Sequence, residues 1–95
     1  MRRRAAEKVK DIHSQQFSAA LGEEIRRRRE GQVLTPRDLA GKAEIPYSSF
    51  CRYEAGAGEI RLGAFHRLCQ ALGAPMSDVL SGARRRRPAQ LLMGV

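Results

Sequence analysis

Apolar residues recur at intervals of three and four along the middle of this 95-residue chain, the spacing that lines one face of an α-helix. No stretch alternates apolar and polar positions as a half-buried strand would, and no internal repeat is present. The helical spacing falls into five segments: residues 18–31, 35–43, 46–55, 62–73 and a last one beginning at 76. The pattern therefore predicts an all-α fold of five short helices.

Local start and stop signals support these boundaries. Ser18 can cap the first helix, so that the acidic residues after it would lie near the positive end of the helix dipole. Gly31 is placed to end that helix. Thr35 followed by Pro36 is a second start signal, because the hydroxyl caps free N–H groups and proline fits the first helical position. These signals predict helices that begin near residues 18 and 36.

The second and third segments are separated by only about three residues, around Glu44 and Ile45. Such a short connection makes two helices cross steeply, as they do in helix-turn-helix units. Ile45 can fill the angle between them, and Ala40 is small enough to allow a close approach. The sequence thus predicts a helix-turn-helix.

The third segment, "PYSSFCRYEAG", has two different faces. One face carries Phe50, Tyr53 and Glu54 at three- and four-residue spacing. The other face offers hydroxyl groups and a guanidinium, from Tyr47, Ser48, Ser49 and Arg52. Such groups suit phosphates and base edges, and arginine can make a bidentate contact with guanine. Small hydroxyl residues also occur on ordinary solvated helices, so this face alone leaves both interpretations open.

Composition narrows the choice of partner. Lys and Arg number 18 against 10 Asp and Glu, which gives a net charge of +8, and most of the cations are arginine. This balance indicates a polyanion, either nucleic acid or an anionic membrane surface. No apolar run approaches the roughly 18 residues of a membrane span. The basic start has no apolar stretch behind it, so no secretory signal is predicted and a bacterial cytoplasmic or nucleoid location is expected.

The cysteines and histidines do not predict a metal or catalytic site. Cys51 and Cys69 are expected to be reduced, buried thiols. Together with His13 and His66 they lack the ligand spacing of a zinc site. No grouping of His, Asp, Glu or Cys has catalytic spacing, so we expect no cofactor and no enzymatic activity.

Three strings together are typical of one family: "DLAGKA", "SSFCRYEAG" and "LCQALG". From Leu21 to Leu80 the chain resembles the Cro and phage-repressor family of helix-turn-helix domains (XRE-type, lambda repressor-like). The resemblance implies a five-helix domain over residues 17–82 that binds double-stranded DNA. It also implies that the third helix lies in the major groove, usually in a homodimer on a palindromic operator.

The resemblance assigns roles to particular residues. It places Tyr47, Ser48, Ser49 and Arg52 where the family reads bases and phosphates. It places Thr35, Pro36 and Arg37 at the start of the second helix, which the family directs at the DNA backbone. In the loop after the third helix, Arg61 is the one cation left to meet the backbone.

Three positions depart from the family pattern. Many members have glutamine where this chain has Pro36, and proline supplies neither the side-chain amide nor a backbone N–H. Tyr47 replaces a frequent Gln or Arg, so contact with a thymine methyl group or a phosphate can replace bidentate readout. The loop that usually carries Asn-Pro and cations has Glu59 and Ile60 instead.

Glu54 is an acid on a helix expected to read DNA. Its helical phase turns it inward, where an unpaired carboxylate would be costly. In the family this glutamate pairs with an arginine of the first helix, and the matching residue here is Arg29. The resemblance therefore implies a buried Arg29–Glu54 ion pair that fixes the angle of the third helix.

The two ends of the chain are basic. Residues 1–16 are expected to form a basic arm or a short extra helix, and residues 83–95 a tail in which Pro88 prevents smooth helix continuation. Both ends are read as flexible in isolation. Their cations either add sequence-independent affinity for DNA or are simply solvated.

The function expected from these features is sequence-specific transcriptional regulation, most like a phage or prophage repressor that occupies an operator. The alternative is an antitoxin-like module that binds a protein partner through residues 83–95 and regulates its own gene through the helix-turn-helix.

Overall fold

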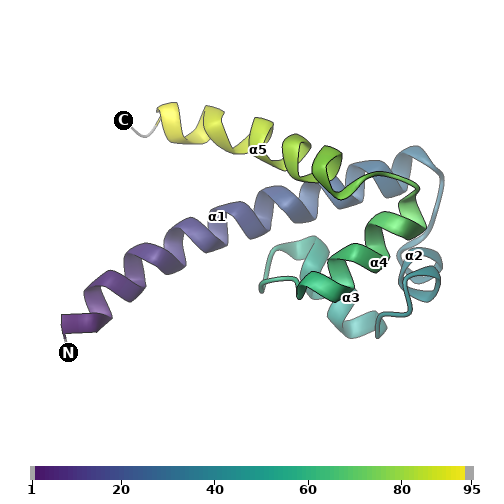
Figure 1. The fold of residues 1–95 in the computed structure, drawn as a ribbon, viewed down its shortest axis with the longest axis horizontal. Helices are drawn as coiled ribbons and strands as arrows, with labels where there is room; N and C mark the ends of the chain where they lie inside the picture. The colour runs from purple at the N-terminus through teal and green to yellow at the C-terminus, as the bar shows by residue number, and fades with distance from the viewer. Residues whose placement is uncertain (1, 94–95) are drawn as a thin grey trace.

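The structure is a computed structural model that describes the backbone of residues 2–93 and the side chains of residues 12–86. Over this part of the chain it contains five helices and no strand, as the sequence predicts (Figure 1). The helices are α1 (Arg2–Gly31), α2 (Pro36–Lys42), α3 (Tyr47–Ala55), α4 (Leu62–Leu72) and α5 (Met76–Met93).

Two of the five helices are long, which differs from the prediction of five short ones. Helix α1 begins at Arg2, so Ser18 is a buried residue inside it and the predicted cap is wrong. The physical reason is that no glycine or proline interrupts residues 2–21, so nothing there stops the helix. The predicted arm over residues 1–16 is helical from Arg2 onward, and residue 1 lies outside the described residues.

Helix α5 also exceeds its prediction. It continues through Pro88 to Met93, whereas the sequence predicted an interruption at the proline. Proline removes one backbone hydrogen bond and strains a helix locally, but it does not have to end one. The predicted tail over residues 83–95 is thus helical to Met93, and residues 94–95 lie outside the described residues.

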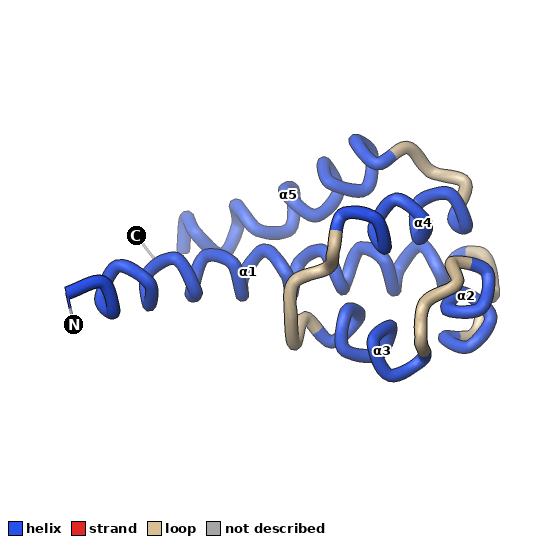
Figure 2. Tube along the Cα trace, turned by 60° about the horizontal axis from the view of Figure 1, so that its bottom comes forward, coloured by secondary structure: helices blue, strands red, loops and turns tan. Residues whose placement is uncertain are grey.

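The helices pack around α1. Helices α1 and α5 run antiparallel, and α3 and α5 lie on opposite sides of α1 (Figures 1 and 2). Each helix contributes at least one large, almost completely buried apolar side chain to the core: Ile25, Leu39, Phe50, Leu68 and Val79. Burial of such a side chain stabilises the fold by about 1.5–3 kcal/mol, so all five helices are held to a single core.

The helix-turn-helix is built as predicted. The Thr35 hydroxyl accepts a hydrogen bond from the Asp38 N–H, and the Asp38 carboxylate accepts one from the Thr35 N–H, each at 3.0 Å. These reciprocal bonds form a capping box that starts α2. The Ile45 N–H donates to the Ala40 carbonyl at 2.9 Å, and both side chains are buried. The turn places Glu44 at φ 57°, a left-handed conformation that the sequence did not reveal.

Within the described part of the chain, no helix is both long enough and apolar enough to span a membrane.

Candidate nucleic-acid interface

The backbone of α3 lies directly against α1. A Cβ atom added to Gly22 would lie 2.5 Å from the carbonyl oxygens of Tyr53 and Glu54. At the end of α3, Gly56 adopts φ 71°, and a Cβ there would lie 2.6 Å from the Ala19 Cα. Only glycine fits either place, because the atoms that a side chain would meet belong to the backbone. Two glycines therefore fix how α3 crosses α1.

An ion pair between α1 and α3 adds to this contact. Arg29 donates from Nε to Glu54 Oε2 at 2.7 Å and from Nη2 to Glu54 Oε1 at 3.2 Å. The side chains are 9% and 12% exposed. Hydrogen bonding to Glu54 raises the pKa of Arg29, so the guanidinium stays charged. Arg29 also donates to the Leu34 carbonyl at 2.8 Å, which ties the segment before α2 to the same arginine.

The two faces of α3 differ in exposure in the predicted way. Phe50 is fully buried, and Tyr53 and Glu54 are partly buried. On the other face Tyr47, Ser48 and Arg52 are exposed and Ser49 is partly exposed. Three of these four side chains are therefore open to a partner, and that of Ser49 is only partly accessible.

The prediction that both thiols are buried is wrong for one of them. Cys69 is buried in α4, and burial raises the pKa of its thiol. Cys51 is exposed, because it follows the fully buried Phe50 by one helical step and so turns to the outer face of α3. The outer face of α3 therefore contains a thiol as well as hydroxyl groups.

Helices α2 and α3 meet at an arginine–tyrosine stack. The Arg37 guanidinium carbon lies 4.0 Å from the centre of the Tyr47 ring. Arg37 is the second residue of α2 and Tyr47 the first of α3, and both are exposed. Next to them lie Pro36 and the Thr35 hydroxyl, which accepts the capping bond but keeps its own proton to donate. The structure thus brings two of the predicted residues, Arg37 of α2 and Tyr47 of α3, into contact.

Arg52 lies towards the other end of α3. Its Nη2 would be 3.2 Å from a Cβ added to Gly58, so the guanidinium reaches the loop between α3 and α4. Arg61 is exposed at the end of the same loop, where it precedes α4. The candidate residues therefore fall into one group around Tyr47 and a second group along this loop.

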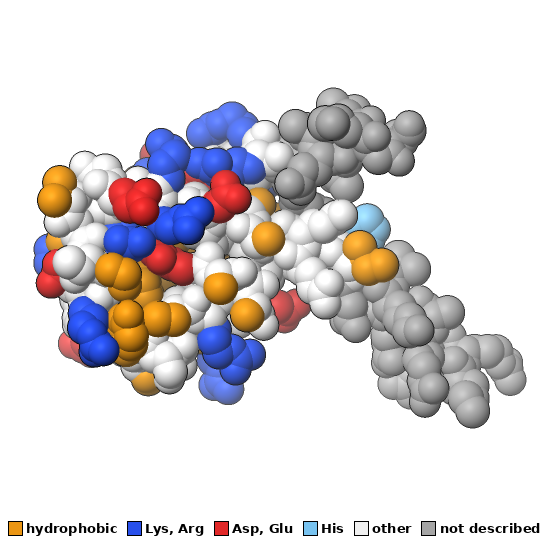
Figure 3. Space-filling view, turned by 180° about the vertical axis from the view of Figure 1, so that it is seen from behind, with side chains coloured by type: hydrophobic (Ala, Val, Ile, Leu, Met, Phe, Trp, Pro, Cys, Tyr) orange, Lys and Arg blue, Asp and Glu red, His pale blue; other side chains and the backbone are white. Residues whose placement is uncertain are grey.

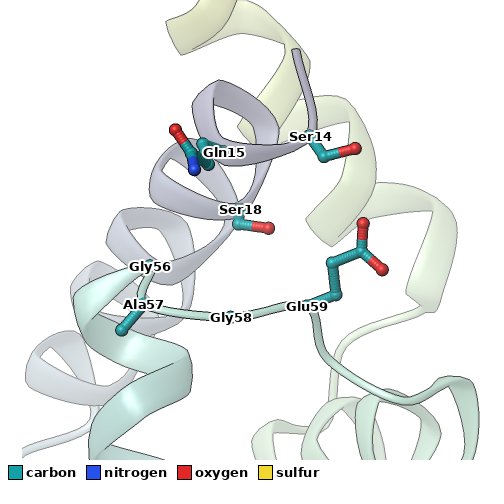
Figure 4. A pocket seen from close by; sticks show the side chains of 7 residues that line it. All are labelled: Ser14, Gln15, Ser18, Gly56, Ala57, Gly58 and Glu59. Carbon is teal, nitrogen blue, oxygen red and sulfur yellow. The ribbon is translucent and has the colours of Figure 1, made fainter. Parts of the chain in front are cut away.

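A hollow lies between that loop and α1. It is lined by Ser14, Gln15 and Ser18 of α1 and by residues 56–59, and Figure 4 shows Ser18 opposite Glu59. Glu59 supplies the one ionisable side chain of this lining. A carboxylate repels phosphate, so the hollow does not suit a DNA backbone and the candidate interface is the outer surface of α2 and α3.

A second charge cluster, which was not predicted from the sequence, joins α1 to α5. Glu24 is 1% exposed and accepts hydrogen bonds from Arg27 at 3.0 Å, Arg28 at 2.7 Å and Arg86 at 3.2 Å. The acidic residues of this segment were predicted to lie near a helix N-terminus. That interpretation is wrong, because α1 begins at Arg2. The signal that was available is the spacing of Glu24 from Arg27 and Arg28, which favours pairing within one helix.

The arginines of the last helix are not equivalent. Arg86 is bound to Glu24 and to Glu23, the latter at 3.3 Å, whereas Arg84 and Arg85 are exposed. These three residues belong to α5, on the opposite side of α1 from α3 (Figures 1 and 2). On the face shown in Figure 3, cations are interspersed with acidic and apolar side chains. The described arginines of α5 therefore do not extend the surface formed by α2 and α3.

A capped α2, a tight turn and an α3 with an exposed polar face define a helix-turn-helix DNA-binding domain. The chain belongs to the helix-turn-helix domain family, which matches residues 20–81. No match was found among curated proteins.

Solved structures of gene regulators have the same fold. Two crystal structures of the clp gene regulator ClgR from Corynebacterium glutamicum are similar to this chain. The first is 28% identical, with a TM-score of 0.77 over 82% of this chain and 83% of that chain. The second is 30% identical, with a TM-score of 0.70 over 74% and 91%. The apo form of the competence regulator ComR from Streptococcus vestibularis is 26% identical, with a TM-score of 0.64 over 68% of this chain and 22% of that chain. The fold is therefore that of a DNA-binding transcriptional regulator.

Proposed function

We propose that this chain is a sequence-specific regulator that places the outer face of α3 in the major groove of double-stranded DNA. The observation that carries the proposal is an exposed polar face on a helix whose tilt is fixed by glycine contacts and the Arg29–Glu54 pair. Precise tilt matters because hydrogen bonds to base edges tolerate little misplacement. Its similarity to the clp gene regulator ClgR supports a role in controlling transcription.

Within this proposal the residues divide into two roles. Ser48, Ser49 and Arg52 approach base edges, and Arg52 is the residue suited to guanine. Thr35, Arg37 and Arg61 contact phosphates, which position the protein without reading sequence. Tyr47 lies at the border between the two groups. Regulation by operator occupancy, as in a phage-type repressor acting as a homodimer in the bacterial cytoplasm, is the specific form that we propose.

Selection of bound fragments from random DNA duplexes tests the proposal directly. We expect one enriched motif, and a palindrome would show two copies bound in symmetric half-sites. Enrichment without any common motif would contradict sequence-specific recognition. A reporter gene whose promoter overlaps the selected motif then tests repression, since an occupying repressor lowers transcription and an activator raises it.

Substitution of Arg52 tests the role of α3. We expect Arg52→Ala to weaken binding to the selected motif by about 1–3 kcal/mol and to relax preference at one base position. Arg85→Ala is the matched control, because Arg85 is an exposed arginine of α5 on the other side of α1. Equal losses for Arg52→Ala on the motif and on unrelated DNA would make Arg52 a phosphate contact.

A further inference from the structure

The stack of Arg37 on Tyr47 has features of a prepared contact. Arg37 has no carboxylate partner among the described residues, although Asp38 is its neighbour in sequence. The Asp38 carboxylate is already used, because it accepts the Thr35 N–H in the capping box. The aromatic ring at 4.0 Å is therefore what holds the guanidinium, through cation–π attraction.

Stacking on the ring leaves the N–H donors of the Arg37 guanidinium free to bind a partner. A ring on one face of the guanidinium does not obstruct its N–H donors, which lie in the plane and form a fork that matches phosphate oxygens. Pro36 has no backbone N–H and no polar side chain, so Arg37 is the first residue of α2 able to donate to a phosphate.

Tyr47 is neutral at neutral pH, because the ordinary pKa of a tyrosine hydroxyl is about 10. Hydrogen bonding with the Cys51 thiol, one turn further along α3, raises that pKa further. The hydroxyl thus remains protonated at neutral pH, and the ring is a neutral platform beside an incoming phosphate rather than a negative charge.

We propose that Tyr47 is a positioning residue that holds the Arg37 guanidinium in place for a DNA phosphate beside the recognition helix. The inference rests on the proposed DNA-binding function and deepens it. It assigns Tyr47 to backbone positioning through Arg37, not to the reading of bases. The order imposed on Arg37 before binding removes part of the entropy cost of forming the contact.

A double-mutant cycle of Arg37→Ala and Tyr47→Leu tests the inference, with binding measured on the selected motif and on unrelated DNA at several salt concentrations. We expect Arg37→Ala to weaken both complexes by about tenfold, since a hydrogen bond to a charged group is lost. The slope of log affinity against log salt should fall by about one. Tyr47→Leu should lower affinity and slope in the same way, and the double variant should bind within about twofold of Arg37→Ala.

Two further variants separate positioning from other roles. Tyr47→Phe keeps the ring, so we expect affinity within about twofold of wild type. Lys42→Ala removes an exposed cation at the far end of α2. The fold-loss in DNA affinity caused by Lys42→Ala should multiply with the fold-loss caused by Tyr47→Leu, because distant sites act independently. Thermal melts of all variants should match wild type, because both stacked residues are exposed.

The outcomes that overturn the inference are distinct. Losses from Arg37→Ala and Tyr47→Leu that multiply in the double variant would show that the ring does not act through Arg37. A Tyr47→Leu loss confined to the selected motif, with an unchanged salt slope, would make Tyr47 a base-reading residue. If wild-type protein selects no motif, the proposed function fails instead, and this result is distinguishable because it precedes any substitution.

Discussion

Helix α1 is held to α3 and to α5 by the same ingredients, a glutamate–arginine cluster and a close-packed glycine, but these are used differently. At the α3 side, Gly22 faces backbone carbonyl oxygens. At the α5 side, Gly82 faces the carboxylate of Glu24. A backbone cannot move aside without moving its whole helix, whereas a side chain can change rotamer. The α1–α3 contact is thus rigid, and the α1–α5 contact depends on where one carboxylate lies.

The charge clusters differ in the same sense. Glu54 has a single arginine partner, Arg29, in bidentate geometry. Glu24 has three arginine partners, two on its own helix and Arg86 on α5. Removal of one arginine leaves Glu24 with others, but removal of Arg29 leaves Glu54 without a described partner. The tilt of α3 therefore depends on the single Arg29–Glu54 pair. The docking of α5 depends on a network in which Glu24 has several arginine partners.

The largest expected effect is at Gly22. Gly22→Ala places a methyl group against two carbonyl oxygens of α3, so we expect a loss of about 4 kcal/mol or more in the free energy of unfolding. Gly41→Ala is the matched control, because Gly41 is also helical and nothing lies within 4 Å of its added Cβ. That control should gain up to about 1 kcal/mol from helix propensity. Urea denaturation measures both, and similar stabilities for the two variants would disprove rigid packing at α1–α3.

The next effect is expected at Glu54. Glu54→Ala leaves Arg29 charged and largely buried, which should lower the free energy of unfolding by about 3–5 kcal/mol. Glu30→Ala is the control, because Glu30 is 64% exposed and lies 3.9 Å from the same arginine. An exposed pair contributes little, so this change should stay within about 1 kcal/mol. Equal losses of unfolding free energy for both variants in urea titrations would show that the Arg29–Glu54 pair does not stabilise the fold more than an exposed pair does.

The comparison also explains what the sequence could reveal. Helices α2 to α4 have strong local signals, such as the Thr35 cap and the left-handed glycines 56 and 73, and their bounds were predicted closely. The partners Arg29 and Glu54 are 25 residues apart, and only the family resemblance joined them.

Other features had no usable local signal. Nothing in the first 17 residues marks a helix start, so the extent of α1 was missed. Arg86 and Glu24 are 62 residues apart, and the side of α1 on which α5 packs is decided by tertiary packing. The Arg37–Tyr47 stack depends on the crossing of α2 and α3, which spacing alone does not give. Local chemistry therefore predicted the elements better than the contacts between them.

The next smaller effect is expected at Gly82, in the contact between α1 and α5. Gly82→Ala would push the Glu24 carboxylate away from its arginines, and we expect a loss of about 1–3 kcal/mol. Adding Glu24→Ala removes the carboxylate that the new methyl group at position 82 would clash with. The double variant should therefore lose less unfolding free energy than the sum of the two single losses. Additive losses in urea denaturation would show that Gly82 is needed for another reason.

The smallest expected effect is a pH dependence at Glu24. Burial alone would raise the pKa of Glu24, but hydrogen bonds from Arg28, Arg27 and Arg86 outweigh it and lower the pKa below the ordinary value of 4.5. A carboxyl group whose pKa is lower in the folded state binds fewer protons there than in the unfolded state. Its contribution to stability is therefore fully present above about pH 4.5 and is lost as the pH falls through the folded pKa.

Glu24→Gln isolates the contribution of Glu24 ionisation to stability, because glutamine keeps the shape of the side chain but cannot ionise. The pKa of Asp38 is also lowered, by hydrogen bonds from Thr35, and its pH dependence is present in both proteins. The difference in unfolding free energy between wild type and Glu24→Gln should thus be constant above about pH 4.5 and shrink below it. A difference that grows on acidification would mean that burial dominates at Glu24, and that the arginines do not hold α5 to α1 through an ionised carboxylate.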